Sequence, residues 1–104
     1  MEKACLNEAF GILGKRWNGL IIHSLLECPL RFSDIAEEIP DISSRMLAQR
    51  LKELEQENML TRTVYPETPV KILYSLTPKG RDLADSILAI QKWADNWCCK
   101  DKEA

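Results

Sequence analysis

The segment from residue 33 to residue 58 most constrains the fold, because its pattern is that of two helices joined by a short turn. The stretch SDIAEEI has the spacing of a short helix with Ser33 as its N-cap, and Pro40 follows its end. The residues PDIS turn the chain, and Ser43 or Ser44 can cap a longer helix that runs to about residue 58. The segment therefore predicts a helix, a tight turn and a second helix.

The longer helix has one apolar face and one polar face. Leu47, Leu51 and Leu54 recur at spacings of four and three residues and predict a buried stripe. The opposite face carries Arg45, Gln49, Lys52 and Gln56. In the major groove arginine contacts guanine and glutamine contacts adenine, whereas serine and lysine hold phosphates. The predicted DNA contacts of this helix are Ser43, Ser44, Arg45, Gln49, Arg50 and Lys52.

Charge is polarised along the same helix. Residues 43–52 contain basic side chains and no acid, whereas Glu53, Glu55 and Glu57 crowd the C-terminal part. The helix dipole favours the opposite order, so the distribution indicates selection for something other than helix stability. Helix-turn-helix proteins insert the N-terminal end of this helix into the major groove. The alternative is a solvated amphipathic helix of mixed charge, and the rest of the chain favours DNA binding.

Two helices are expected before this segment. Leu6, Ala9, Phe10 and Leu13 form the apolar stripe of a helix over residues 5–13, which Gly14 ends. A second, mostly apolar helix is expected over residues 17–27, stopped by Pro29. His23 lies within it and is expected to be a core or boundary residue rather than a ligand.

A hairpin and a long helix follow the segment. The runs LTRTVY and VKILYSL, separated by PETP, predict two β-strands joined by a stiff loop. This wing carries Arg62 and Lys71 as further DNA contacts. A helix over residues 77–97 follows, capped by Thr77. The predicted fold class is mainly α with a small β-hairpin wing, a winged helix-turn-helix.

The chain as a whole is expected to form one domain over residues 1–104, frayed at 1–4 and 98–104. The apolar run GLIIHSLL is too short to span a membrane and no signal segment opens the chain, so a cytoplasmic protein is expected. Four cysteines with no zinc spacing favour reduced thiols, with no metal and no cofactor. An enzyme is disfavoured because no catalytic constellation is present. The net charge of −2 makes DNA binding depend on where the charges lie.

The last helix carries a second apolar stripe at coiled-coil spacing. Its members are Leu83, Ile87, Ile90, Ala94 and Trp97. A monomer this small has little core left to cover the stripe, so it predicts a homodimer interface, with docking on the chain's own first helix as a compatible alternative. The dimer would form through the N- and C-terminal helices.

The motifs GKRW, LRFSDI, S..ML..RLKELE and YSLT..G, found in this order, resemble the HxlR-type family of winged helix-turn-helix regulators. The resemblance covers roughly residues 5–97. It implies a MarR-like homodimer that binds a palindromic double-stranded DNA operator, usually as a repressor, with its two recognition helices about one helical turn apart.

More narrowly, Cys5 before AFGILGKRW and Cys98 after WADNW are similar to a Gram-positive branch of this family that senses quinones, diamide and other electrophiles. The resemblance implies that Cys5 is the sensing thiol, which either forms an adduct or bonds to Cys98 of the other subunit. The sequence places Cys5 in the first turn of a helix. No counterpart supports Cys28 or Cys99. This chain lacks the proline that many members have after the cysteine, which leaves the helix start open.

Two alternatives to electrophile sensing remain. A repressor of the same fold could respond to a non-covalent small ligand, with its cysteines incidental. A winged helix could also serve protein contacts, and such a module would show no salt-dependent affinity for DNA and would tolerate Arg45→Ala.

Overall fold

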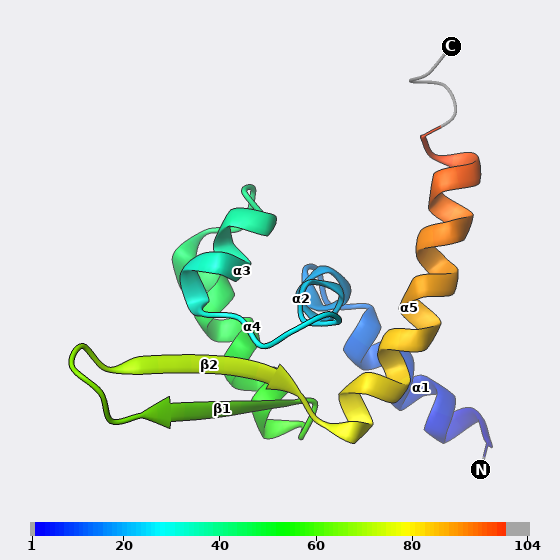
Figure 1. Ribbon diagram of the computed structural model, residues 1–104. Helices are drawn as coiled ribbons and strands as arrows, with labels where there is room; N and C mark the ends of the chain where they lie inside the picture. Colours follow the sequence, from blue (N-terminus) through cyan, green and yellow to red (C-terminus); the bar gives the residue numbers. More distant parts are fainter. Residues whose placement is uncertain (1, 100–104) are drawn as a thin grey trace.

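The computed structural model describes residues 2–99 and has two helices, a helix-turn-helix, a β-hairpin and a long final helix in chain order (Figure 1). The elements are α1 (Glu2–Leu13), α2 (Asn18–Ser24), α3 (Phe32–Glu38), α4 (Ser44–Gln56), β1 (Leu60–Tyr65), β2 (Lys71–Leu76) and α5 (Pro78–Trp97). Mainly helical structure with one hairpin is confirmed. No helix among residues 2–99 is both long and apolar enough to cross a bilayer.

Helix α1 begins at Glu2, three residues earlier than the predicted start. Residues 2–4, expected to be frayed, are therefore helical, and Cys5 is the fourth residue of the helix, at the end of its first turn. The predicted end at Leu13 is confirmed. The N–H of Gly14 donates to the carbonyl of Phe10 at 2.6 Å, and a Cβ at Gly14 would lie 2.6 Å from that oxygen, so glycine is required there. Residue 1 and residues 100–104 of the predicted frayed ends lie outside the described residues.

Helix α2 is shorter than the predicted range of 17–27. It starts after Trp17, whose φ of 84° lies in the left-handed region, and it ends at Ser24, well before Pro29. The Ser24 hydroxyl donates to the carbonyl of Ile21 at 2.6 Å. The next two N–H groups, of Leu25 and Leu26, bond to carbonyls three residues back. This tighter turn ends the α-helix without help from the proline.

The helix-turn-helix is confirmed, with one changed cap. The N-cap of α3 is Arg31 rather than Ser33, because the carboxylate of Asp34 accepts the Arg31 N–H at 3.2 Å. At α4, Ser43 is the N-cap, and its hydroxyl accepts the N–H of Met46 at 3.0 Å. Helix α4 ends at Gln56, slightly before the predicted limit.

The wing is an antiparallel hairpin in which Leu60 pairs with Leu76 and Tyr65 with Lys71. Tyr74 also exchanges two backbone hydrogen bonds with Leu30, the residue that precedes the helix-turn-helix, at 3.0 and 2.8 Å. These bonds fix the base of the wing against the helix-turn-helix.

The end of α4 and the start of α5 are joined by a group of hydrogen bonds. The Thr77 hydroxyl donates to the carbonyl of Asn58 at 2.6 Å and accepts the N–H of Gly80 as the predicted cap of α5. Lys79 donates to the carbonyl of Glu57 at 2.8 Å. Gly80 packs so closely on the carbonyl of Met59 that a side chain there would collide with it. This α4–α5 joint (residues 57–59 and 77–80) holds the two helices in one relative orientation.

The core lies between α2, α3, α4 and the first half of α5. Leu47, Leu51 and Leu54 are at most 1 % exposed, as the predicted stripe requires. Ile87, assigned from the sequence to a dimer interface, is 7 % exposed and belongs to the chain's own core, because this part of α5 packs on α2. His23 is a boundary residue, as predicted, and its Nε2 lies 2.9 Å from Oε1 of Gln91 on α5.

Candidate DNA-binding surface and cysteine site

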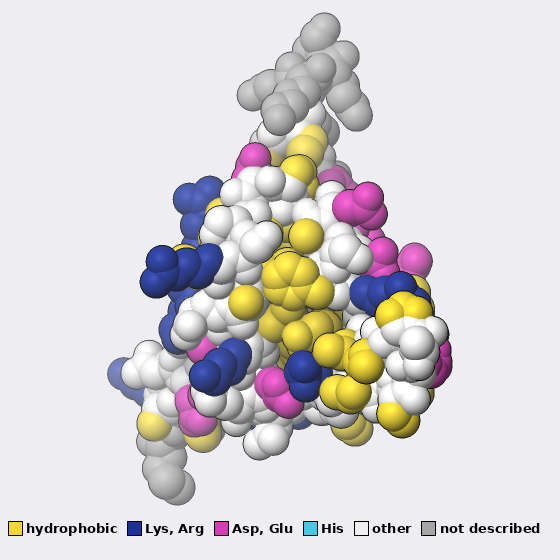
Figure 2. Space-filling view, turned by 90° about the vertical axis from the view of Figure 1, so that its left-hand side faces the viewer, with side chains coloured by type: hydrophobic (Ala, Val, Ile, Leu, Met, Phe, Trp, Pro, Cys, Tyr) yellow, Lys and Arg dark blue, Asp and Glu magenta, His cyan; other side chains and the backbone are white. Residues whose placement is uncertain are grey.

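The outer face of α4 is exposed where the sequence predicts DNA contacts. Ser43, Ser44, Arg45, Gln49 and Lys52 are all exposed. Figure 2 shows the side of the molecule that carries α3 and the tip of the hairpin, with lysine and arginine side chains gathered along its left edge. An exposed helix face with arginine, glutamine and serine side chains can contact base edges and phosphates.

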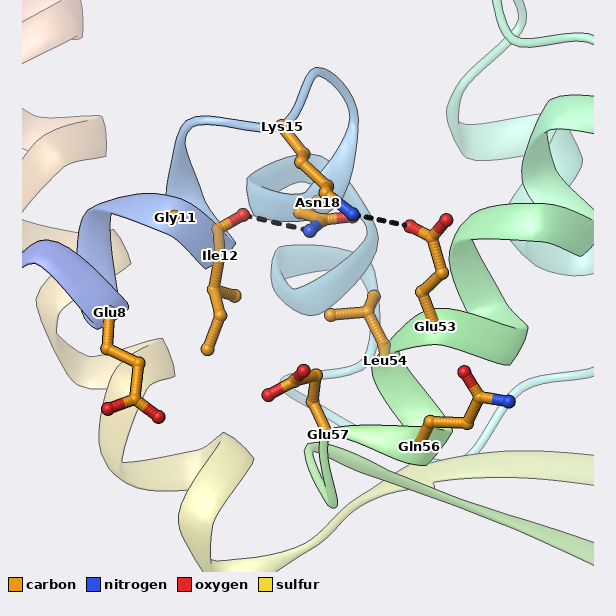
Figure 3. A pocket seen from close by; sticks show the side chains of 9 residues that line it. All are labelled: Glu8, Gly11, Ile12, Lys15, Asn18, Glu53, Leu54, Gln56 and Glu57. Carbon is orange, nitrogen blue, oxygen red and sulfur yellow. Dashed lines mark hydrogen bonds and ion pairs between the residues drawn. The ribbon is translucent and has the colours of Figure 1, made fainter.

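Arg50 differs from the other predicted contacts on α4, because it is half-buried and ion-paired. Its guanidinium donates to Oε1 of Glu53 at 2.6 Å, one turn along α4. The same carboxylate accepts Nε2 of Gln49 at 2.8 Å and Nζ of Lys15 at 3.2 Å. Glu53 therefore joins two predicted DNA contacts to the turn that follows α1. Figure 3 shows the pair that Glu53 forms with Lys15.

These donors keep Glu53 ionised. The hydrogen bond from Gln49 is the largest cause, and the bonds from Lys15 and Arg50 and the charge of Arg50 add to it, against the opposing effect of burial. Together they lower the pKa of Glu53 from 4.5 to about 2. A carboxylate without a proton can only accept hydrogen bonds.

The two wing cations do not share a face. Arg62 pairs with Tyr74, and Lys71 pairs with Tyr65. Paired residues share a face of the hairpin, and side chains alternate between the faces along a strand. Since Arg62 and Tyr65 are three positions apart on β1, Arg62 and Lys71 lie on opposite faces. Arg62 is exposed, whereas Lys71 is half-buried, with its ammonium 5.8 Å from the centre of the Tyr65 ring. The two residues can therefore not contact one DNA strand in the same way.

Cys5 is exposed and lines a cavity of about 440 Å³ between α1 and the α4–α5 joint. On the α1 side the cavity is lined by Cys5, Glu8, Ala9 and Ile12, and on the other side by Met59, Lys79, Asp82, Leu83 and Ser86. Apolar side chains, an ammonium and two carboxylates thus surround an accessible thiol. A cavity of this size, with apolar and charged side chains in its walls, can accept a small molecule.

Cys98 lies far from this cavity within one chain. It is the exposed C-cap of α5, twelve residues beyond Ser86, the last helical residue that lines the cavity. That separation is about 18 Å along the helix axis. A disulfide requires Cα atoms within about 7 Å, so Cys5 and Cys98 of one chain are not a bonding pair in this arrangement. Cys28 and Cys99 are also exposed.

A second cavity, of about 410 Å³, lies behind the recognition helix, between α1, α2 and α4 (Figure 3). Asn18 lines it and is only 2 % exposed, and its Nδ2 donates to the carbonyl of Ile12 at 2.8 Å. Its Oδ1 has no partner among residues 2–99. Within those residues no group of three His, Cys, Asp or Glu side chains could hold a metal ion.

Glu53 and Lys15 belong to this site although the sequence pattern did not predict them there. Glu53 follows Gln49 by four residues and Arg50 by three, which is the spacing of side-chain pairs on a helix, so this signal was available. Lys15 is 38 residues away from Glu53, and nothing local links the two.

A helix-turn-helix followed by a hairpin, with an exposed polar face on its second helix, defines a winged helix-turn-helix DNA-binding regulator. The model of the HxlR-like helix-turn-helix family matches residues 12–102. The chain belongs to this family, whose members are transcriptional regulators and not enzymes.

Among its relatives is the transcriptional regulator YodB of Bacillus subtilis, 56 % identical over 93 residues that cover 89 % of this chain and 83 % of the relative. The solved structure of reduced YodB is similar to this chain with a TM-score of 0.78 and covers 88 % of this chain and 90 % of that one. Structures of diamide-treated and quinone-bound YodB give TM-scores of 0.75 and 0.76, at 56 % and 48 % identity. The first covers 88 % of this chain and 90 % of that one, and the second 90 % and 99 %.

The redox regulator HypR in its oxidised form is also similar, with 31 % identity and a TM-score of 0.84. The match covers 88 % of this chain and 94 % of that one. A redox regulator thus shares the fold of this chain.

Proposed function

We propose that this protein is a homodimeric repressor that binds a palindromic operator and leaves it when quinones or other thiol-reactive electrophiles modify Cys5. The observation that carries the proposal is the exposed Cys5 thiol on the wall of a cavity between α1 and the α4–α5 joint. The quinone-bound and diamide-treated states of the similar YodB support it. Because a repressor binds chromosomal DNA, the proposal includes a cytoplasmic location for this protein.

The chemistry needs only the thiol and the electrophile. The thiolate of Cys5 adds to a ring carbon of the quinone, forming an S–C bond. The proton of that ring carbon and the proton released by the thiol end on the two carbonyl oxygens, which become hydroxyls, so the quinone is reduced to a hydroquinone bound through the new S–C bond. With diamide, two thiols each give one electron and one proton to the N=N bond, and a disulfide results. Since Cys98 of the same chain is too distant, that disulfide would join Cys5 to Cys98 of the second subunit.

The homodimer is supported by apolar side chains that this chain leaves uncovered. On α1, Leu6 and Phe10 are 55 % and 60 % exposed, and on α5, Ile90, Trp93 and Trp97 are 53 %, 58 % and 70 % exposed. Exposed apolar surface of this extent marks an interaction site. Of the five predicted interface residues, Leu83, Ile90, Ala94 and Trp97 stay in the proposal, whereas Ile87 is withdrawn to the core.

Release from the operator follows from where the cavity lies. Both of its walls belong to the proposed dimer layer, so an adduct at Cys5 changes how α1 packs against α5. Such a shift alters the spacing of the two α4 helices, which must match one turn of DNA, about 34 Å. Ser43, Ser44, Arg45, Gln49, Arg50, Lys52, Arg62 and Lys71 are the proposed DNA contacts.

The test compares DNA binding before and after electrophile treatment. A duplex is first selected from a randomised DNA pool with the reduced wild-type protein. Binding is then measured for wild type, Cys5→Ser and Cys28→Ser with and without benzoquinone, alongside the mass of each protein. We expect wild type and Cys28→Ser to gain one quinone and lose the duplex, and Cys5→Ser to keep it.

Three outcomes contradict the proposal. Release of Cys5→Ser as readily as wild type would show that Cys5 is not the sensor. Release without a gain in mass would favour a non-covalent ligand. If no duplex is bound in a salt-dependent way, or if Arg45→Ala changes nothing, the winged helix serves protein contacts instead.

A further inference from the structure

We propose that Glu53 is a positioning residue for base recognition: it fixes the orientation of the Gln49 amide, so that the protein selects adenine at the base that faces Gln49. The inference rests on the proposed role of α4 as the helix that contacts DNA. In this role Glu53 affects which DNA sequence is preferred, although it contacts no base itself.

The hydrogen bond from Gln49 to Glu53 settles which way the amide points. An isolated glutamine amide can present either its NH₂ group or its oxygen, since rotation by 180° exchanges the two. The Glu53 carboxylate accepts Nε2 of Gln49 at 2.8 Å, and an ionised carboxylate has no hydrogen to offer to the amide oxygen. The flipped amide would place oxygen against oxygen, so one orientation is retained.

Glu53 is itself held in place. Lys15 reaches its Oε1 at 3.2 Å from the turn after α1, and Arg50 reaches the same oxygen at 2.6 Å from α4. Its side chain is only 25 % exposed. Two cations around one carboxylate also offset its charge, so that the carboxylate can lie next to a DNA phosphate backbone with less repulsion.

The fixed amide has one N–H and its oxygen still available. Gln49 is exposed, and no other described side chain or backbone group takes either of them. Adenine presents an acceptor, N7, and a donor, the N6 amino group, in the major groove, which match these two groups. Guanine presents two acceptors, N7 and O6, and the fixed amide oxygen would meet one of them without a hydrogen between. The pinned amide therefore favours adenine over guanine.

The experiment measures base preference rather than affinity alone. The duplex selected by the reduced wild-type protein is varied at each base pair, and competition binding is measured for wild type, Gln49→Ala, Glu53→Gln and the double variant. Glu55→Gln is the matched control, because Glu55 is an exposed acid on the same helix that has no side-chain partner in the described chain, and the charge change is identical. Circular dichroism and thermal melting establish that each variant is folded.

We expect one base pair in each half-site at which wild type prefers adenine over guanine by about tenfold or more. Gln49→Ala should lose that preference at this position. Glu53→Gln should lose most of it at the same position, because a glutamine at 53 can also donate and so permits the flipped amide. The double variant should lose no more than Gln49→Ala does, and Glu55→Gln should keep the preference.

A Glu53→Gln protein that keeps the adenine preference lost in Gln49→Ala would overturn the inference. The same holds if Gln49→Ala changes no position, or if Glu55→Gln relaxes preference as much as Glu53→Gln. If the wild-type protein selects no duplex, the proposed function itself fails, and this outcome is distinct from the others.

Discussion

Lys15, in the turn that follows α1, forms a 3.2 Å ion pair with Glu53 on α4. This ion pair joins the turn after the Cys5 helix to the helix that is proposed to contact DNA. The cavity behind α4 has both residues on its wall (Figure 3). The turn after α1 is therefore linked directly to α4 by this ion pair, in addition to the packing of both on α2.

Replacing Lys15 by alanine should weaken this link with little effect on stability, because the lysine is half-exposed and such pairs contribute less than about 1 kcal/mol. We expect Lys15→Ala to bind benzoquinone at Cys5 as fully as wild type and to retain more of its affinity for DNA afterwards. Binding curves of the treated and untreated proteins measure the difference. Arg16→Ala, at the neighbouring cation, is the control and should respond as wild type does. Equal release of Lys15→Ala and wild type would show that the signal reaches α4 by another route.

The stability of the protein should depend on pH through Glu53. Because the pKa of Glu53 falls from 4.5 to about 2 on folding, the stabilisation is fully present above pH 4.5 and is lost as the pH falls toward 2. Thermal melts of wild type and Glu53→Gln between pH 7 and pH 2.5 measure this. The difference in Tm between the two proteins should shrink over the lower part of this range. Glu55→Gln should run parallel to wild type, and a constant difference for Glu53→Gln at all pH values would contradict the assigned pKa.

A charge in the exposed apolar surface of α5 should separate the subunits. Trp93 is 58 % exposed, so Trp93→Glu removes a large apolar contact across the proposed interface without disturbing the core. Analytical ultracentrifugation should show a monomer, and affinity for the palindromic duplex should fall by at least tenfold, since two linked half-site contacts become independent. Val70→Glu, in the hairpin loop and 60 % exposed, should stay dimeric. A dimeric Trp93→Glu protein would move the interface elsewhere.

Local pattern predicted the parts of the fold that depend on neighbours in the chain. The leucine stripe of α4 and the caps at Ser43 and Thr77 involve residues at most four apart, and all three are confirmed. The predicted end of α2 was wrong. Pro29 is a stop signal that can be recognised in the sequence, whereas the hydrogen bond of the Ser24 hydroxyl, which accompanies the actual end, cannot be recognised there.

In the candidate site, too, the features that depend on local sequence were predictable and those that depend on distant residues were not. The exposed face of α4 follows from its periodicity, and Cys5 was found by resemblance. The burial of Ile87 in the chain's own core could not be predicted, since the coiled-coil spacing of α5 is the same whether the helix packs on α2 of its own chain or on a second chain. The cavity beside Cys5 depends on residues more than 70 positions apart, such as Cys5 and Lys79, and has no local signal.

Because the α4–α5 joint holds the two helices in one relative orientation, a rotation of the joint is carried along the whole of α4. Helix α4 has 13 residues and is therefore about 20 Å long, and the joint holds its C-terminal end while Arg45 lies at the other. A turn of about 5° at the joint moves the N-terminal end by about 1.7 Å, more than half of the length of a hydrogen bond. Met59 and Lys79 belong to this joint and also line the cavity of Cys5, so we expect a molecule bound there to act on the joint directly. Under the proposed function, a molecule as small as a quinone can therefore produce a large displacement at the N-terminal end of α4.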